Sequence, residues 1–276
     1  MRRTLAIATL LLVLGGCGGS SPNTGVVARA AANTASAAGY RIAALITLAG
    51  RAGGETAVAL DGSFDRADNI AQFTTIAGAG GNPLRIPELV AARTVYVGAS
   101  AFPNGVRLSG GKQWLKLDLS RARAAVGITS LTTTSDPTQF IDYLRAVSSE
   151  TSSKGIQTIR GVPVAHYRAT VDLNRYPDLV AAGDRQSVRR SIKTLEAALG
   201  GHTLPVDTWI DPNGLVRRIS LTLGECVSRA HVTFSMTMDL FDYGAQARPQ
   251  LPAARDVYDI TPVIAKALRH VDLGCT

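Results

Sequence analysis

The chain has 276 residues, of which 46% are apolar and 18% are charged, and its formal net charge at pH 7 is +8. This composition is typical of a folded body and excludes a disordered chain, while the length suffices for one large domain or two small ones. No motif in the sequence indicates nucleic-acid binding. Two of the positive charges, Arg2 and Arg3, lie in a segment that we expect to be removed.

Residues 1–16 have the pattern of a secretion signal. Two arginines are followed by an apolar run over residues 5–14, and then by two glycines and Cys17. A helix formed by this run would span about 15 Å, half of the roughly 30 Å core of a bilayer, so it is too short to cross a membrane. We therefore expect residues 1–16 to be a cleaved signal peptide.

The segment LGGC at residues 14–17 resembles the cleavage box of bacterial lipoproteins, whose cysteine becomes the first mature residue and carries acyl chains. The resemblance implies that Cys17 is a lipid anchor. Two or more acyl chains suffice for stable anchoring. We therefore expect the protein at the extracytoplasmic face of the cell membrane; the alternative is an ordinary signal peptide followed by a chance cysteine.

The two other cysteines, Cys226 and Cys275, form an even pair in a compartment that permits disulfides. A bond between them would close a loop of about fifty residues and stabilise the fold by roughly 4 kcal/mol in the chain-entropy model. The alternative is two unpaired, buried thiols.

Residues 17–38 are small, polar and without period, which predicts a lipidated N-terminus followed by a flexible tether. Whether the last part of this tether becomes helical on docking stays open. Residues 39–276 are expected to form one domain. Strand-like alternation begins at residues 40–50 and is strongest at residues 231–240, where every second residue is apolar.

Two segments predict amphipathic helices. The first starts with Asp136 as N-cap and Pro137 at the first helical position, and the second spans residues 185–199 and ends at Gly200. Their apolar stripes are Phe140, Tyr143, Leu144 and Val147 in the first helix and Val188, Ile192, Leu195 and Leu199 in the second. We predict an α+β fold: a strongly curved antiparallel sheet of about ten strands with two or three helices against one face.

The segment HTLPVDTWIDPNGLVRR, residues 202–218, holds polar side chains that could suggest an active site. Its DPNG sequence suits a type I turn closed by a glycine bulge, so we predict a β-hairpin instead. The register stays open. A three-residue loop would place Trp209 opposite Arg217, and a two-residue loop would place Asp207 opposite Arg218.

Other candidate chemistry is weak. The four histidines, His166, His202, His231 and His270, are scattered without metal-ligand spacing, so we expect no metal and no cofactor. The sequence has no nucleophile-elbow motif of the serine hydrolases, and we expect no catalytic residue. A hydrolase would be favoured only if His166 or His231 lay beside a serine and an aspartate in a cleft.

The order of these features resembles the LolA-like superfamily of lipid-carrying proteins, and in particular the LppX/LprG-type lipoproteins of bacterial cell envelopes. The residues that carry the resemblance are the box ending in Cys17, the segments 161–173 and 204–219, the FDYG sequence at 241–244, Pro252 and Asp256, with Trp114 and Pro137 in the expected order. The resemblance covers nearly the whole mature chain as a pattern, and it indicates a fold more than an activity.

This resemblance implies a half-open barrel whose concave face, covered by helices, encloses an apolar cavity for acyl chains. It also implies a non-catalytic, anchored protein that binds or carries a lipid or another apolar ligand, and we expect a monomer. The cavity-lining candidates are Leu221, Leu223, Val232, Phe234, Met236 and Met238. Two alternatives stay open: these residues could simply fill a core, and the protein could be an anchored interaction module without a ligand.

Overall fold

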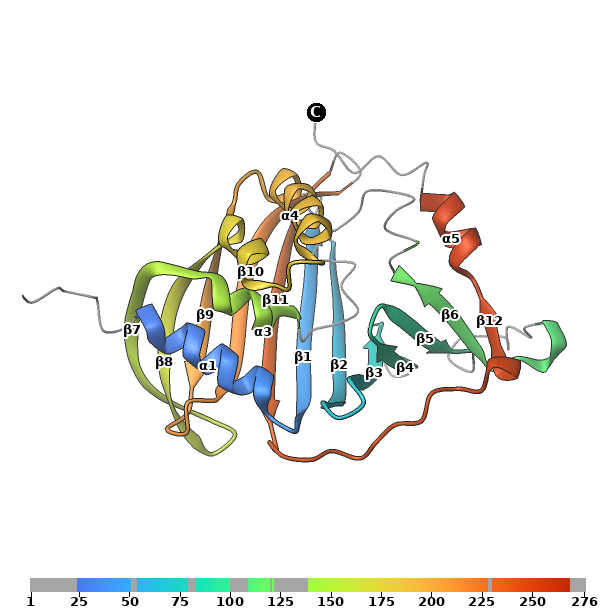
Figure 1. Ribbon diagram of the computed structural model, residues 1–276, viewed down its shortest axis with the longest axis horizontal. Coiled ribbons are helices and arrows are strands. Elements are labelled where there is room, and N and C mark those ends of the chain that lie inside the picture. The colour runs from blue at the N-terminus through green and yellow to red at the C-terminus, as the bar shows by residue number, and fades with distance from the viewer. Residues whose placement is uncertain are drawn as a thin grey trace, which may run out of the picture.

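The structure is a computed structural model that describes residues 24–50, 54–78, 83–99, 109–119, 121, 139–227 and 230–268. Its strands form one 12-stranded sheet that curves into an open half-barrel (Figure 1). Across the sheet the strands follow in the order β12 (Val257–Asp259), β6 (Trp114–Asp118), β5 (Thr94–Gly98), β4 (Leu84–Ala91), β3 (Ile70–Ala77), β2 (Glu55–Asp65), β1 (Gly39–Gly50), β11 (Ala230–Phe241), β10 (Val216–Val227), β9 (Thr203–Ile210), β8 (Val162–Asp172) and β7 (Val147–Ile159).

The helices lie mainly over one half of this sheet. The helical elements are α1 (Thr24–Ser36), η2 (Ser109–Gly111), α3 (Gln139–Tyr143), η4 (Leu144–Ala146), η5 (Leu173–Leu179), α4 (Arg185–Leu199), η6 (Ala254–Asp256) and α5 (Thr261–Leu268). In Figure 1, α1, α3 and α4 lie in front of the strands from β7 to β11. Helix α1 packs against β7, β9 and β10, and α4 packs against β10 and η5. We call the side of the sheet that carries these helices the inner face, and the opposite side the outer face.

The α+β fold class and the curved antiparallel sheet are confirmed, but the expected strand number was too low. The missed strands are β4 and β12. Strand β4 contains Pro87, and proline weakens a strand pattern because it cannot donate to a ladder. The ladder between β4 and β5 runs from Glu88 to Ala91 and leaves Pro87 out, so no donor is needed there. Strand β12 has three residues, too few for an alternation to be seen.

The expected tether of residues 17–38 is wrong for residues 24–36, because these form α1. Its buried residues follow helical spacing: Val27 and Ala31 have no exposed surface, and Ala30 has 2%. Thr34 is fully buried too, and its Oγ1 accepts a hydrogen bond of 2.9 Å from the backbone N–H of Val216 in β10. The folded body therefore includes α1 and extends upstream of residue 39, its expected start.

The two predicted helices have different outcomes. Helix α4 has the predicted bounds and ends at Gly200, whose φ of 68° is the left-handed conformation that a helix C-cap requires. The first predicted helix is much shorter than its pattern indicated, because α3 and η4 end at Ala146 and Val147 already begins β7. Asp136 and Pro137, its predicted start, lie outside the described residues.

The predicted hairpin joins β9 and β10. Asp211 Oδ1 accepts hydrogen bonds from the backbone N–H groups of Asn213 and Leu215, at 2.9 and 3.0 Å, and Gly214 has a φ of 73°. The register differs from both alternatives, since Ile210 lies opposite Val216 and Trp209 lies opposite Arg218.

The reason for this register is a β-bulge at Arg217. The extra residue turns its side chain away from the ladder, so that its Nε donates a 2.7 Å hydrogen bond to the buried Oδ2 of Asp211. The guanidinium also lies 4.9 Å from the ring centroid of Tyr243. One arginine therefore links the turn to the end of β11, where the FDYG sequence lies.

The two edges of the sheet have different forms. At one edge, β12 pairs with β6 in parallel, after the chain has crossed from the middle of the sheet along residues 242–253 (Figure 1). At the other edge, β7 pairs with β8 through two register shifts. The second shift includes Gly155, whose φ is 97°, and the neighbouring Lys154 is exposed.

Candidate functional site

The predicted cavity-lining residues lie in neighbouring rows on the inner face. Phe234 lies opposite Leu48 of β1 on one side and Leu223 of β10 on the other, and Met236 lies opposite Ile46 and Leu221. Directly opposed residues in an antiparallel sheet project to the same side. The rows therefore form a continuous apolar surface under the helices.

Burial separates these six candidates into two groups. Met238, Phe234, Met236, Leu221 and Leu223 are 0–6% exposed and belong to the hydrophobic core that also includes α1 and α4. Val232, near the start of β11, is only half-buried. The candidates thus occupy the floor of the covered half, and their burial fits both a core and the wall of a lipid site.

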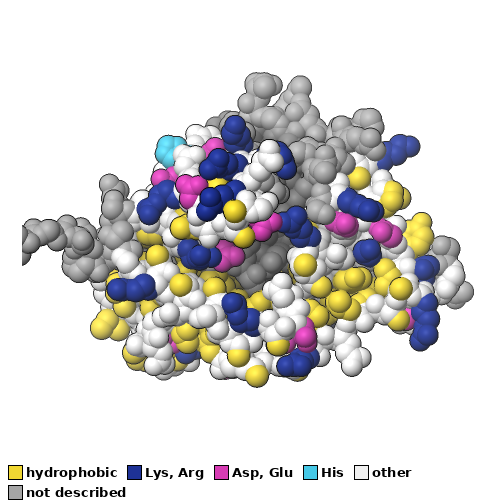
Figure 2. Space-filling view, viewed as in Figure 1, with side chains coloured by type: hydrophobic (Ala, Val, Ile, Leu, Met, Phe, Trp, Pro, Cys, Tyr) yellow, Lys and Arg dark blue, Asp and Glu magenta, His cyan; other side chains and the backbone are white. Residues whose placement is uncertain are grey.

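The apolar inner face continues into strands β1–β5, where buried residues such as Phe73 and Val90 alternate with half-exposed ones. Figure 2 shows hydrophobic side chains gathered over this part of the sheet. We call this surface the half-exposed strip. Its residues are Ile46, Leu48, Val58, Leu60, Thr75, Ile86, Glu88 and Val97. An apolar surface that stays partly open is the expected form of a site for an apolar ligand.

Glu88 differs from the rest of the half-exposed strip because it carries a carboxyl group. It lies opposite Phe73 in β3 and Val97 in β5. Burial raises the pKa of the Glu88 carboxyl above its ordinary value, and a hydrogen bond from the Thr75 side chain opposes that shift. Neither this residue nor β4 was predicted from the sequence. In LRIPELVA every second residue from Leu84 is apolar except Glu88. An acidic residue at such a position is the signal that could have identified it.

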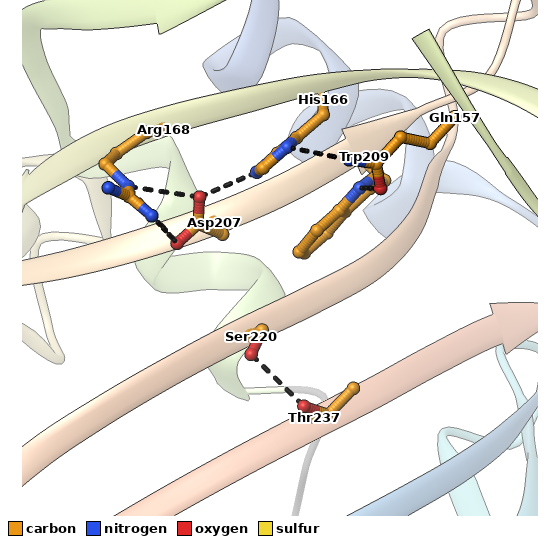
Figure 3. A network of polar contacts seen from close by, with 7 residues as sticks. All are labelled: Gln157, His166, Arg168, Asp207, Trp209, Ser220 and Thr237. Carbon is orange, nitrogen blue, oxygen red and sulfur yellow. Dashed lines mark hydrogen bonds and ion pairs between the residues drawn. The ribbon is translucent and has the colours of Figure 1, made fainter. Parts of the chain in front are cut away.

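The outer face over β8 and β9 carries a polar network instead (Figure 3). His166 Nε2 lies 2.7 Å from Asp207 Oδ1, and Arg168 donates to both oxygens of the same carboxylate at 3.2–3.4 Å. The His166 ring stacks on Trp209 with 4.2 Å between the centroids and 10° between the planes. Gln157 completes the network, since its Oε1 accepts a 2.8 Å hydrogen bond from Trp209 Nε1.

This network brings together a histidine and an aspartate, as a hydrolase would, but it supplies no nucleophile. The second ring nitrogen of His166 lies 3.4 Å from Gln157 Nε2, not beside a hydroxyl. Ser220 is opposite Asp207 in the β9–β10 ladder, but its hydroxyl pairs with Thr237 at 3.1 Å (Figure 3). The arrangement explains these polar residues as cross-strand partners that stabilise the sheet.

A second group of charges on the outer face stabilises the join between β10, β11 and the β7–β8 turn. Arg218 and Arg160 both donate to the Asp239 carboxylate, which is buried, with Nε distances of 2.5 and 3.1 Å. The Arg160 guanidinium also lies 3.9 Å from the centroid of the Phe241 ring, close enough for a cation–π contact.

Tyr243, the tyrosine of the FDYG sequence, has a structural position. Its hydroxyl donates to the backbone carbonyl of Val216, and its ring lies 5.6 Å from that of Tyr40. Burial raises the pKa of this phenol, and a hydrogen bond with the Thr34 side chain opposes the shift. The residue therefore joins the end of β11 to β10 and α1.

The cysteine predictions are untested. Cys17 and Cys275 lie outside the described residues, and only the backbone of Cys226 is described, opposite His231 near the end of β10. Within the described ranges, no helix has the length and hydrophobicity needed to span a membrane. The same part of the chain holds no group of three His, Cys, Asp or Glu side chains that could bind a metal ion.

No family model matches the chain. A curated relative is 29% identical over 161 residues, which make up 56% of this chain and 51% of the relative: an uncharacterized 31.2 kDa protein encoded in the rplA–rplJ intergenic region of Streptomyces griseus. The chain thus spans about half the length of this relative.

Similar solved structures include two mycobacterial proteins. LprF from Mycobacterium bovis is 13% identical, with 84% of this chain and 97% of that chain covered and a TM-score of 0.44. The Mycobacterium tuberculosis lipoprotein LppX is 14% identical, with 83% and 100% covered and a TM-score of 0.47. A LolA superfamily protein from Nitrosomonas europaea is 8% identical, with 82% and 94% covered and a TM-score of 0.33.

An LppX lipoprotein and a LolA superfamily protein, the types that the sequence resembles, are therefore among the solved structures similar to this chain. All three TM-scores lie below 0.5, so these similarities assign no function by themselves.

Proposed function

We propose that the protein is a non-catalytic, membrane-anchored lipoprotein that binds or carries a lipid, or another apolar ligand, on the inner face of its sheet. The observation that carries this proposal is the largely apolar surface that runs from the buried rows under α1 and α4 into the half-exposed strip. Its deep end includes the candidates Leu221, Leu223, Val232, Phe234, Met236 and Met238.

The energetics favour an acyl chain on such a surface. Each methylene that leaves water contributes about 0.8 kcal/mol, so a chain of ten buried methylenes supplies roughly 8 kcal/mol before ordering costs. This binding needs no polar motif. It fits a chain whose His166–Asp207 pair lies on the outer face without a nucleophile.

The test is native mass spectrometry of the full chain with and without long-chain lipids, using two matched variants in β1. Leu48→Gln places an amide on the inner face, where Leu48 is half-buried opposite Phe234. Leu45→Gln makes the same change on the outer face, where Leu45 is 51% exposed opposite Thr237. We expect Leu48→Gln to lower the lipid-bound fraction and Leu45→Gln to leave it unchanged.

A wild-type chain that binds no lipid would contradict the proposal. Recovery of a stoichiometric protein partner by that lipid-free chain would instead favour the interaction module.

Anchoring is a separate part of the proposal and has its own test. We expect Cys17 to be the acylated first residue of the mature protein at the extracytoplasmic face of the cell membrane. Intact-mass analysis should show the acyl chains on the wild type, and Cys17→Ser should move the protein from the membrane to the soluble fraction. A Cys17 without acyl chains in the mature product would overturn the anchor and leave the ligand site standing.

A further inference from the structure

The inner rows of strands β1–β6 carry one charged side chain among the described residues, and it is that of Glu88. The register places it between Phe73 and Val97, and the next inner positions along β4 are Ile86 and Val90. All four neighbours are apolar. The carboxyl group therefore projects into the apolar surface that we propose binds the ligand.

Phe73, which lies opposite this carboxyl group in β3, belongs to the buried core. Its side chain is 1% exposed, and its ring packs over Gly62 in β2. A Cβ atom at Gly62 would come within 2.6 Å of the ring, so no larger residue fits there without a shift. On the other sides of Glu88, Ile86 and Val97 are half-exposed whereas Val90 is buried. Glu88 therefore lies at the margin where buried core residues meet the accessible part of the surface.

The carboxyl group has few partners of its own. The Thr75 side chain offers one hydrogen bond, and no ion pair joins Glu88 to a lysine or arginine in the part of the chain that the structure describes. A carboxylate has about four acceptor positions, so most of its hydrogen-bonding capacity is left for water or for a ligand. Glu88 is partly exposed, so a ligand that covers it has to replace this water with donors of its own.

We propose that Glu88 binds the polar end of the ligand, and that the ligand is an amphiphile whose polar part carries hydroxyl or ammonium donors next to its acyl chain. This inference rests on the proposed lipid-binding function and adds a ligand class to it. An amphiphile with an anionic end, such as a fatty acid, is disfavoured because a second negative charge would lie against the carboxylate.

Three probes with an 18-carbon monounsaturated chain test the class: 1-monooleoylglycerol with two hydroxyls, oleylamine with an ammonium, and oleate with a carboxylate. Binding to the full chain is measured at pH 7.5 by displacement of a fluorescent fatty-alcohol probe. We expect the wild type to bind the first two at least about fivefold more tightly than oleate, which corresponds to the net contribution of one hydrogen bond. Whichever of 1-monooleoylglycerol and oleylamine binds more tightly then shows whether the ligand carries hydroxyl or ammonium donors.

The variants separate the charge of Glu88 from its size. Glu88→Gln should bring oleate within about twofold of 1-monooleoylglycerol, because the repulsion is removed while the amide still accepts a hydrogen bond. Glu88→Leu should weaken 1-monooleoylglycerol by about fivefold and leave oleate unchanged or tighter. The control is Glu55→Gln, which removes an exposed carboxylate at the start of β2, and it should behave like the wild type.

Two outcomes overturn the inference in different ways. If all three probes bind and the Glu88 variants rank them as the wild type does, the ligand class is wrong and the proposed function stands. If none of the probes binds the wild type, the proposed function fails and takes the ligand class with it. A change of melting temperature in Glu88→Gln relative to Glu55→Gln shows whether a loss of binding comes from unfolding.

Discussion

The two halves of the sheet share one pattern of alternating residues but differ in what covers them. Strands β7–β11 lie under α1, α3 and α4, and most inner residues of β9, β10 and β11 are buried there. Strands β1–β5 carry similar inner rows, yet many of those residues stay half-exposed. Alternation therefore makes an apolar face along the whole sheet, and the helices add to the part of that face that becomes core.

The largest expected effect comes from one cross-strand pair that has a member in each half. Phe234 is 1% exposed, and Leu48 opposite it in β1 is half-buried. Phe234→Ala should lower the free energy of unfolding by about 3–5 kcal/mol, because a buried cavity remains. Leu48→Ala should lower the same free energy by about 1–2 kcal/mol, since the half-buried Leu48 side chain buries less apolar surface on folding. Urea denaturation of both variants checks this, and equal losses would contradict the division into two halves.

The next effect concerns the hairpin that closes the covered half. Asp211 is 4% exposed and accepts hydrogen bonds from two backbone N–H groups and from Arg217. Asp211→Ala should destabilise the fold by about 2–4 kcal/mol, because it leaves these donors without an acceptor. The control is Asp178→Ala in an exposed pair with Arg189, for which we expect a loss below about 1 kcal/mol. A similar loss in both variants would mean that the turn does not depend on Asp211.

A smaller effect is expected where α1 joins the sheet. Thr34 accepts a hydrogen bond from the backbone of Val216, and Thr34→Val keeps the shape while removing that acceptor. The loss should be about 1–2 kcal/mol. Hydrogen exchange should show faster exchange at the Val216 amide and within α1, while amides in β3 keep their protection. Unchanged exchange in α1 would show that the helix does not rely on this contact.

The smallest effect distinguishes the open half by its response to pH. Because burial raises the pKa of Glu88, the folded state still binds a proton at pH values where the unfolded chain has released it. The residue therefore destabilises the fold as the pH rises above the ordinary pKa of a glutamate. Glu88→Gln should therefore be more stable than the wild type at pH 7, and the difference should disappear near pH 4. Thermal unfolding across this range checks the sign, and a wild type that is the more stable at pH 7 would contradict it.

The sequence predicted those parts of the fold whose local patterns are strong. Helix α4 has the bounds that its stripe of Val188, Ile192, Leu195 and Leu199 indicated, and the DPNG turn closes a hairpin. The pattern did not predict the bulge at Arg217, whose side chain contacts Asp211 within the hairpin and Tyr243 far along the chain.

Helix α1 and strand β4 escaped prediction for different physical reasons. The buried side of α1 consists largely of Ala30, Ala31 and Thr34, which are small enough to pack close to the sheet but give little hydrophobic signal. Strand β4 has a proline in its middle and a carboxyl group at an apolar phase. The candidate site was therefore predicted at its deep end, around Met236, and missed at its polar end, at Glu88.

An open sheet exposes backbone donors and acceptors at both margins, and such margins can recruit further chains into aggregates. Here one margin is only three residues long, and the other is interrupted by a glycine kink beside a lysine. Neither offers a long, straight template for another strand. The half-barrel can therefore stay unclosed, with its apolar inner face partly open to solvent, at little risk that two copies pair edge to edge.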